Sequence, residues 1–549
     1  MPTCGSEPCT PLTMMPAPGV QFTSPPVGDV NLDGDHNDSP LRFRAVDNVL
    51  GLASPPGLAE WELVQELMVA LGDEPATAKE AKCVKEWREA MLEEMASIEH
   101  NKTWSLVDLP GGHHMIGLKW VFKLKRDEHR DISKYKARLI AKGYIQRQGI
   151  DYEEVFTPIA RIESVRVFLA VVACWCWVVH HMDVKSAFLN GELAEEVYVA
   201  QPPGFITAEH KRKALYGLKQ APRAWNAKLH ASLQELGFAR SSCEHGLYTC
   251  GVKQSRLVVG IYIDDLIIMG ESCKEIGAFK EEMKALFRMS DLGALTYYLC
   301  IEVRQGWRGI ELSQAVYARK VLEKAGMGAY KPYITPMETR LKLSKHSTSP
   351  AVDAIEYRCL IGSLRYLVNT RPDLAFAVGY LSRFMEDPRQ EHMAGIKHLL
   401  RYVTGTVDYG LVYARSNAEP GLVGYSDSDM RSTSGIIFFL DSNPKQRVVA
   451  LSSCEAKYIA CALAACHGVW LGRLLADVQG AKSSPPTLKM DNYKHIDTKF
   501  HCIRECVDNG AVRLAYAGTQ EQLVDILTKA LEKDRFRKLR ELIGVTKLK

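Results

Sequence analysis

The sequence predicts an α+β fold organised around an antiparallel β-hairpin. Between Ser255 and Gly270, two apolar and largely β-branched runs of strand length flank a short polar turn, a pattern typical of a hairpin. Other apolar residues recur at helical spacing, which predicts amphipathic core helices. One such stripe comprises Trp225, Leu229, Leu233 and Leu236. The hydrophobic share of 46% and the charged share of 24% are those of a soluble globular protein.

Two adjacent carboxylates, Asp264 and Asp265, stand in the predicted turn of this hairpin. Side-by-side carboxylates repel each other unless a cation lies between them. A polar turn between two buried strands is the alternative interpretation. The tetrapeptide Tyr262–Asp265 does not decide between them, because short motifs also match by chance.

A third acid, Asp183, follows an apolar run from Val167 to Val179 that we interpret as a strand. A lone acid after a strand is usually a cap or turn residue. Three acids on neighbouring strand ends could instead hold two divalent cations, which clamp the attacking and leaving oxygens of a phosphoryl transfer. Mg²⁺ suits this chemistry because it keeps carboxylate and phosphate oxygens in its shell.

Three stretches in this order resemble the reverse transcriptase of copia-type retrotransposons. They are DVKSAF at Asp183–Phe188, LYGLKQAPRAW at Leu215–Trp225 and YIDD at Tyr262–Asp265. The resemblance extends from about Val84 to the C-terminus. It implies a right-hand polymerase, with fingers, a palm containing an antiparallel sheet and a thumb with connection, followed by a ribonuclease H-like α/β domain.

The resemblance also implies an activity, an RNA-directed DNA polymerase that transfers nucleotides by a two-metal mechanism. Asp183, Asp264 and Asp265 would be the catalytic residues and the ligands of Mg²⁺ or Mn²⁺. The expected partners are an RNA template, a DNA primer and deoxynucleoside triphosphates. The expected organisation is a disordered Pro/Ser/Gly-rich leader over 1–80, fingers and palm over 81–310, thumb and connection over 311–415, and an incomplete ribonuclease H-like domain over 420–549.

A dense basic stretch from Lys119 to Lys142 coincides with KYKARLIAKGY, which resembles the fingers of the family. Basic runs are usually solvated faces, but Lys and Arg also suit phosphate binding. The resemblance implies nucleotide or template contacts for five residues: Lys136, Arg138, Lys142, Phe188 and Gln220. Phe188 would be a steric gate against a ribose 2′-hydroxyl, with a core aromatic as the alternative. Gln220 would lie by the templating base pair.

The segment from about 420 resembles a ribonuclease H domain, whose acids would be Asp427, Asp491 and Asp525. The fourth acid is replaced, because SSCEAKY at Ser452–Tyr458 has Lys457 at its place. Glu455 precedes Lys457 by two residues, about 200° around a helix, so it would face away. A loop after Asp429, a strand between Phe439 and Val449 and a helix after Asn492 are also expected to be missing. We therefore expect these acids to be vestigial and ribonuclease H activity to be absent.

Composition sets further expectations. The net charge of +4 does not by itself indicate a nucleic-acid binder, and the 15 cysteines form no metal-like pair, which favours an intracellular protein, in a cytoplasmic particle or the nucleus. We expect no secretory signal, no membrane span and no membrane partner. We find no zinc knuckle, protease triplet or integrase segment, so we do not expect the chain to transpose alone. The oligomeric state is not readable from the sequence.

Two hypotheses of function remain open at this point. The first is an active polymerase, which the three intact palm acids favour. The second is a non-catalytic retrotransposon remnant that at most binds nucleic acid. Two observations favour the second. The segment between Phe205 and Leu215 is shortened, and Cys300 stands at a turn position where the family usually has Gly.

Overall fold

The computed structural model describes residues 74–548, except for 76, 102, 108–114, 127–131, 159, 201, 204–210, 214–217, 252–254, 329, 416–420, 429–433, 439–452, 481–483, 491–500 and 519. Most of the predicted leader therefore lies outside the described residues. The described part contains helices and mainly antiparallel sheets, so the prediction of an α+β fold with antiparallel sheets is confirmed.

The first described part of the chain contains two helices and two small sheets. Helices α3 (Ala78–Cys83) and α4 (Lys85–His100) precede the long hairpin of β2 (Leu118–Arg126) and β3 (Ile132–Ala141). A second pair joins β1 (Trp104–Val107) to β5 (Lys211–Lys213). One face of α4 is apolar and buried, and it contains Trp87, Met91, Met95 and Ile98. They pack with apolar residues of β2 and β3 in one core.

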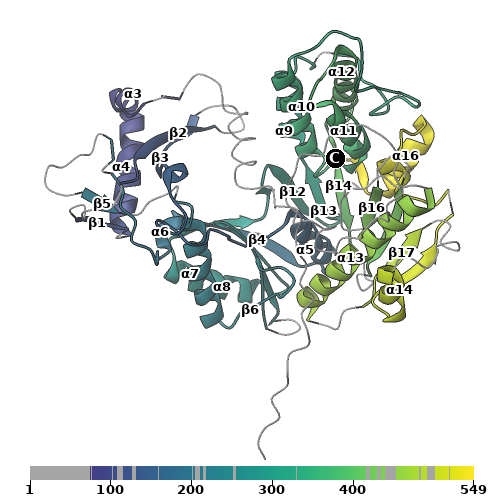
Figure 1. The fold of residues 1–549 in the computed structure, drawn as a ribbon. Coiled ribbons are helices and arrows are strands. Elements are labelled where there is room, and N and C mark those ends of the chain that lie inside the picture. Colours follow the sequence, from purple (N-terminus) through teal and green to yellow (C-terminus); the bar gives the residue numbers. More distant parts are fainter. Residues whose placement is uncertain are drawn as a thin grey trace, which may run out of the picture. The chain divides into compact units, whose positions relative to one another are not determined.

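A six-stranded antiparallel sheet carries the predicted acid hairpin. Its order is β10 (Met289–Ala294), β4 (Val178–Val184), β9 (Asp265–Gly270), β8 (Leu257–Tyr262), β7 (Leu247–Cys250) and β6 (Ala239–Arg240). Alternating residues of β8 and β9 enter different cores. Val258 and Ile267 pack with α5 (Ile162–Trp175), whereas Val259 and Ile268 pack with α7 (Ala221–Glu235) and α8 (Cys273–Leu286). Figure 1 shows α7 and α8 next to the short helix α6 (Ala187–Asn190).

The apolar run before Asp183 corrects one expectation. We predicted a strand over Val167–Val179, but most of this run belongs to α5, which is buried on nearly every side. Cys176 ends the helix in a left-handed conformation with φ 56°, and β4 begins two residues later. A continuous apolar run has no period that separates a buried helix from a buried strand.

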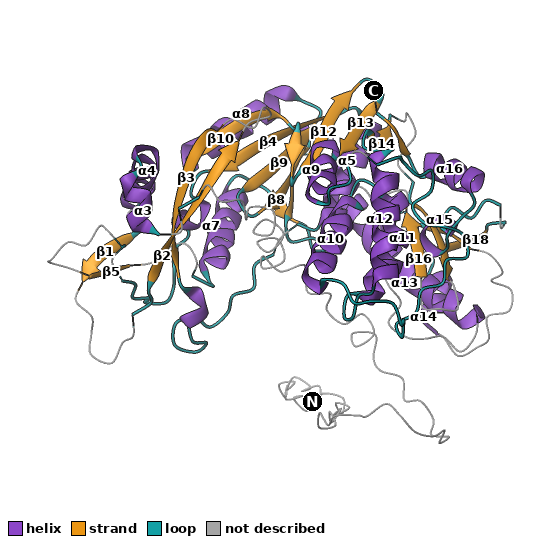
Figure 2. Cartoon of the chain, turned by 90° about the horizontal axis from the view of Figure 1, so that it is seen from above, coloured by secondary structure: helices purple, strands orange, loops and turns teal. Residues whose placement is uncertain are grey.

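A five-stranded antiparallel sheet lies beside a group of helices. Its order is β11 (Tyr297–Tyr298), β12 (Ile301–Gly306), β13 (Gly309–Ser313), β14 (Tyr409–Ala414) and β19 (Val545–Lys547). Figure 2 shows the helices that precede β14 gathered together. They are α9 (Ala315–Lys324), α10 (Ala354–Leu367), α11 (Ala375–Leu381) and α12 (Gln390–Thr404). The sheet crosses the predicted boundaries near 310 and 415–420, because strands from all three predicted regions pair in it.

The C-terminal part forms a four-stranded sheet of order β16 (Ser434–Phe438), β15 (Val423–Ser428), β17 (Thr487–Met490) and β18 (Arg513–Tyr516). β15, β17 and β18 are parallel to one another, and β16 is antiparallel to β15. Four helices accompany it: α13 (Ser453–Gln479), α14 (His501–Asp508), α15 (Asp525–Thr528) and α16 (Lys533–Leu542). The strand and helix that we expect to be missing fall within 439–452 and 491–500, outside the described residues.

One helix segment departs from our expectation about membranes. By length and composition, Ala460–Gln479 within α13 is long and apolar enough to cross a bilayer, although we predicted no such segment. Half of that window is buried inside the structure. Its buried residues Leu471, Leu474 and Val478 share a core with Ile436 and Leu488 of the four-stranded sheet. Burial of this kind is typical of a core helix in a globular domain.

Candidate active site

The structure brings the three predicted aspartates together at one end of the six-stranded sheet. Asp183 is the last but one residue of β4, and the strand register places it directly opposite Asp265, the first residue of β9. Asp264 stands between β8 and β9 in the turn of the hairpin. The Asp264 carbonyl accepts a hydrogen bond of 2.9 Å from the Val184 backbone N–H, which ties the turn to β4.

Two basic side chains contact these carboxylates. The Lys185 Nζ contacts Oδ2 of Asp183, and the His181 Nε2 lies 2.8 Å from Oδ1 of Asp265. Both aspartate side chains are about a quarter exposed, at 27% and 25%. His181 is buried and packs edge-on against Tyr298, with 6.0 Å between the ring centroids. These contacts hold the two cross-strand carboxylates at the rim of the sheet.

Asp264 has the most perturbed carboxyl group of the three. Burial is the largest cause that raises its pKa to about 6, followed by the negative charges of Asp265 and Asp183. Burial and both turn carboxylates also raise the pKa of the Tyr262 hydroxyl. The three carboxylates therefore interact strongly, and a positive charge at this end of the sheet would favour their ionised forms.

The donor set fits a hard divalent cation in its chemistry. Carboxylate oxygens are preferred ligands of Mg²⁺, and a bound cation would favour the ionised form of Asp264, whose pKa is raised first by burial and then by the charges of Asp265 and Asp183. Within the described part of the chain, no group of three or more His, Cys, Asp or Glu side chains is arranged so that it could hold a metal ion. Asp183 contacts Lys185 through Oδ2, and Asp265 contacts His181 through Oδ1.

The three predicted basic residues of the β3 region have different surroundings. Arg138 donates a hydrogen bond of 3.0 Å to Glu94 of α4, whose burial raises the pKa of its carboxyl group although Arg138 opposes this. The aliphatic stem of Lys142 lies over Gly117. The charge of Lys136 lowers the pKa of Asp264, so Lys136 acts on the aspartate cluster. Arg138 is thus held in the packing between α4 and β3.

Gln220, expected beside the template, is turned into the protein. The side chain is only 2% exposed. Its Oε1 accepts a hydrogen bond of 3.0 Å from Gln146 Nε2, and its Nε2 donates one of 2.8 Å to the Asp151 carbonyl. Lys219 joins the same network, because its backbone N–H donates to Gln146 Oε1 at 2.8 Å. Gln220 therefore fastens the segment around 146–151 to the start of α7.

Phe188 lies on α6, five residues after Asp183. Its half-buried ring packs against two hydrophobic cores, that of α4 with β2 and β3 and that of α7 with α8. The preceding Ser186 has a left-handed backbone with φ 53°, and its hydroxyl lies 2.9 Å from that of Ser97 on α4. Phe188 thus fills the junction between these two cores, five residues after Asp183 in the sequence.

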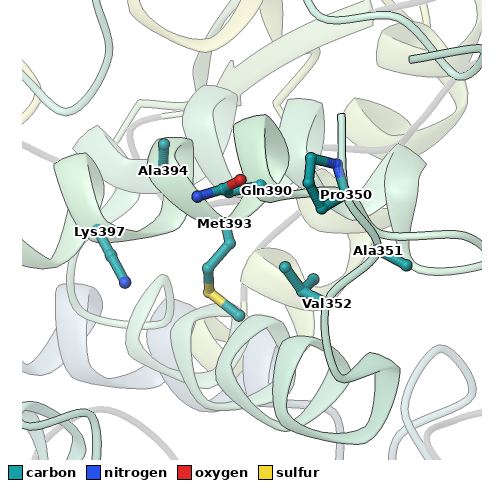
Figure 3. Close-up of a pocket in the computed structure, with 7 residues that line it drawn as sticks. All are labelled: Pro350, Ala351, Val352, Gln390, Met393, Ala394 and Lys397. Carbon is teal, nitrogen blue, oxygen red and sulfur yellow. The ribbon is translucent and has the colours of Figure 1, made fainter. Parts of the chain in front are cut away.

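A separate cavity of about 480 Å³ opens between α12 and the loop before α10 (Figure 3). It contains none of the predicted site residues. Its lining residues are Pro350, Ala351, Val352, Gln390, Met393, Ala394 and Lys397.

Comparison with known proteins places this geometry in a family. The model of the family described as "Reverse transcriptase (RNA-dependent DNA polymerase)" matches residues 101–339, which include all three aspartates. The chain is 36% identical to the retrovirus-related Pol polyprotein from transposon RE1 of Arabidopsis thaliana, over 93% of this chain and 37% of that protein. It is 36% identical to the Pol polyprotein from transposon TNT 1-94 of Nicotiana tabacum, over 83% of this chain and 37% of that protein.

A shorter relative, which the alignment covers almost completely, shows the family of this chain. The putative transposon Ty5-1 protein of Saccharomyces cerevisiae is 32% identical, and the alignment covers 51% of this chain and 97% of that protein. This chain belongs to the reverse transcriptases of copia-type retrotransposons. The predicted resemblance to that family is confirmed. The chain spans little more than a third of the length of the two Pol polyproteins.

The C-terminal acids of this chain are only partly described. Asp427 is buried on β15, and Asp525 begins α15. Asp525 is ion-paired through both carboxylate oxygens, with Lys529 at 2.7 Å and Arg535 at 2.9 Å. Asp491 and the side chains of Glu455 and Lys457 lie outside the described residues, as do the side chains of the basic segment Lys211–Lys213.

The hairpin of β11 and β12 contains the Cys that stands where the family usually has Gly. Tyr298 pairs with Ile301, so the turn consists of Leu299 and Cys300 alone. Both have positive φ, 46° and 55°. Two-residue turns with two positive φ angles are usually built from Asn and Gly, because a Cβ makes this conformation costly. This turn therefore does require the backbone conformation that glycine adopts most easily.

Several residues of the site escape sequence reasoning. Trp225 was predicted only as a core residue, and it is buried, but its indole N–H also donates a hydrogen bond of 2.8 Å to the Ile263 carbonyl. Ile263 itself has φ 59°. The contacts of His181 and Lys185 with the aspartates were not predicted either. Their nearness to Asp183 in the sequence was a usable signal, whereas no sequence pattern indicates the Trp225 contact.

Proposed function

We propose that this chain is an RNA-directed DNA polymerase whose transfer site is formed by Asp183, Asp264 and Asp265. The observation that carries the proposal is the cross-strand pair of Asp183 and Asp265, with Asp264 beside it in the turn. Repulsion within this group contributes to raising the pKa of Asp264 to about 6. Such strongly coupled carboxylates mark sites of cation binding and catalysis more often than structural turns.

Asp183 and Asp264 would be the main ligands of Mg²⁺ or Mn²⁺ in this proposal, and Asp265 would support them. Bound divalent ions supply charge stabilisation to the attacking and leaving oxygens of a nucleotidyl transfer. Within the chain, Lys185 and His181 keep two of the carboxylates oriented when no ion is bound. The identity of the three donors and their common place at one end of the sheet support this proposal.

The substrates of the proposed reaction are a primer on an RNA template and deoxynucleoside triphosphates. Lys136 is the basic residue of β3 that interacts with the aspartate cluster, which supports a role with the triphosphate. Arg138 and Lys142 remain candidates for template contacts. Gln220 would act by holding the start of α7, since both ends of its amide are bonded within the protein.

Phe188 is proposed as the steric gate against ribonucleotides. It stands at the junction of α6 with two cores, so packing alone is the competing role. Phe188→Ala should let ribonucleotides enter the product in a competition assay, because a small side chain leaves room for the 2′-hydroxyl. Unchanged discrimination between the two sugars would leave Phe188 as a packing residue only.

The C-terminal region is proposed to be a ribonuclease H-like unit without cleavage activity. Asp525 is neutralised by Lys529 and Arg535 and is buried, so it is poorly suited to bind a cation. Lys457 on α13 adds a positive charge where an acid is expected, and at about 4 Å it would repel a metal by several kcal/mol at an effective dielectric near 20. Glu455 stands about 200° away around the helix.

A non-catalytic remnant that binds nucleic acid is the second candidate. The contact of Lys185 with Asp183 and the two left-handed residues of the β11–β12 turn favour it. Primer extension on an RNA template with Mg²⁺, by the purified full-length chain, separates the two candidates. Extension supports the polymerase. A folded protein, shown by a cooperative thermal melt, that binds primer–template without extending it would support the remnant.

A further inference from the structure

We propose that Trp225 is a positioning residue that holds the strained β8–β9 turn through its indole N–H and thereby fixes Asp264. The turn consists of Ile263 and Asp264, because Tyr262 pairs directly with Asp265. Ile263 has φ 59°, a left-handed value that is a genuine outlier for a β-branched residue. Hairpins with one such residue usually place Gly there, so the aspartates stand on a turn that the local sequence does not favour.

The contacts of the turn show what opposes this strain. Trp225 Nε1 donates a hydrogen bond of 2.8 Å to the carbonyl of Ile263, the strained residue itself. On the other side, the Val184 N–H donates to the Asp264 carbonyl at 2.9 Å. The two bonds hold consecutive carbonyls of the turn from α7 and from β4. Loss of the first would remove the bond from Trp225 to the peptide between Ile263 and Asp264, because the Asp264 carbonyl held by Val184 belongs to the next peptide.

Trp225 is itself firmly placed. It is 2% exposed and packs edge-on against Phe287, with 5.2 Å between the ring centroids and an interplanar angle of 81°. A Cβ built on Gly191 would lie 2.6 Å from the Trp225 backbone nitrogen, so the chain after α6 lies directly against the start of α7. An anchor fixed by this packing can hold a strained turn, because its own position changes little.

Substitutions can distinguish a positioning role of Trp225 from a role in packing alone. Trp225→Phe keeps an aromatic ring in the core and removes the N–H. Ile263→Gly removes the Cβ, so the left-handed conformation no longer needs an external restraint. If Trp225 acts through the turn, the effect of Trp225→Phe should shrink when residue 263 is Gly. If Trp225 acts through packing, the two substitutions should add independently.

The test uses the full-length chain in four forms: wild type, Trp225→Phe, Ile263→Gly and the double variant. Trp470→Phe is the matched control, because the indole of Trp470 donates a similar bond of 3.1 Å to a backbone carbonyl outside the turn, that of Cys243. The first readout is hydrogen exchange of the peptide covering 257–270. The second is kcat and KM for nucleotide in primer extension, and only this readout rests on the proposed function.

We expect Trp225→Phe to accelerate exchange in the hairpin and to lower kcat, each about fivefold, the worth of one neutral hydrogen bond. KM should change little, because the nucleotide contacts remain. The double variant should return toward the values of Ile263→Gly, and Trp470→Phe should leave both readouts unchanged. Unchanged hydrogen exchange in Trp225→Phe would overturn the proposal. So would an effect of Trp225→Phe that is equally large whether residue 263 is Ile or Gly. If the wild type extends no primer, the proposed function fails, and the exchange data still decide the role of Trp225.

Discussion

Single residues at the β8–β9 turn carry the chemistry of this chain, and Asp264 is the most perturbed of them. Burial is the largest cause of its raised pKa, followed by the charges of Asp265 and Asp183. The folded protein therefore binds a proton at Asp264 more tightly than the unfolded chain does. This carboxyl group favours folding fully below about pH 4, and the contribution is lost as pH rises to about 6.

Asp264→Asn should therefore stabilise the metal-free protein in a pH-dependent way. Asn is neutral at every pH and escapes the repulsion, so the melting temperature of the variant should exceed that of the wild type above pH 6. The difference should disappear toward pH 4, where Asp264 is protonated. Thermal melts in EDTA from pH 4 to pH 8 measure it. Glu271→Gln, an exposed acid just after β9, is the matched control. A difference that is constant over this pH range would contradict the assignment of the pKa shift.

Residue identity predicted part of the site and missed part of it. The three aspartates could be predicted to converge because strand ends and a tight turn bring sequence-distant acids together. The hydrogen bonds of Gln220 could not be predicted, since the sequence does not show whether an amide side chain faces solvent or the core. The left-handed φ of Ile263 was also not predictable, because it depends on a tertiary contact with Trp225 that overrides local preference.

Among the structural elements, the β11–β12 hairpin shows the clearest conflict between sequence and conformation. Leu299 and Cys300 both occupy the left-handed region, which costs L-residues roughly 1–2 kcal/mol each. Tyr298, just before this turn, packs against Tyr262 with 6.3 Å between the ring centroids, so the hairpin lies close to the aspartate turn. The surrounding tyrosines maintain a turn that its own residues disfavour.

Cys300→Gly should stabilise the chain by about 1 kcal/mol, because glycine adopts the left-handed conformation without a Cβ penalty. The melting temperature of the variant measures this. Cys300→Ala is the control, since it removes the thiol and keeps the Cβ, and it should not stabilise. Equal stabilisation by Ala and Gly would assign the effect to the thiol and would contradict backbone strain at this position.

Secondary-structure elements with a clear period were predicted well. The stripe of α7 was recognised from its helical spacing, and the hairpin of β8 and β9 from its two apolar runs. The error at α5 arose because its residues are buried on nearly every side and leave no polar stripe. The pairing of β19 with β14 was not predictable either, since 130 residues, 415–544, separate the two strands.

At the scale of the whole molecule, the C-terminal residues share cores with the rest of the described chain. Phe536 and Leu539 of α16 pack in one core with α10, α11 and α12. Arg540 donates a hydrogen bond of 3.1 Å to the Tyr402 hydroxyl, which in turn donates to Asp373 at 2.7 Å. At the far end of α13, Arg256 donates a bond of 2.7 Å to the Val478 carbonyl. The C-terminal region therefore contributes to stability whether or not it cleaves RNA.

The chain should not cleave RNA in an RNA–DNA hybrid, with Mg²⁺ or with Mn²⁺. The reason is that the proposed acids cannot hold both cations, because Asp525 is bound by Lys529 and Arg535 and Lys457 adds a positive charge. Incubation with an end-labelled hybrid measures this. Lys457→Glu alone should not restore cleavage. Cleavage by the wild type that disappears in Asp427→Asn would contradict this expectation and would assign an active second site to the chain.

The central claim is that Asp183, Asp264 and Asp265 act together as the transfer site of a reverse transcriptase. Incorporation of a single deoxynucleotide into a DNA primer on an RNA template tests it most directly. We expect incorporation by the wild type and by the control Glu271→Gln. We expect a loss of at least a thousandfold in Asp183→Asn and in Asp264→Asn, on the scale of several kcal/mol that a bound metal contributes to the transition state. Binding of the duplex should stay nearly unchanged in both. Incorporation at wild-type rates by either variant, or its absence in a wild type that is folded and binds the duplex, would contradict the claim.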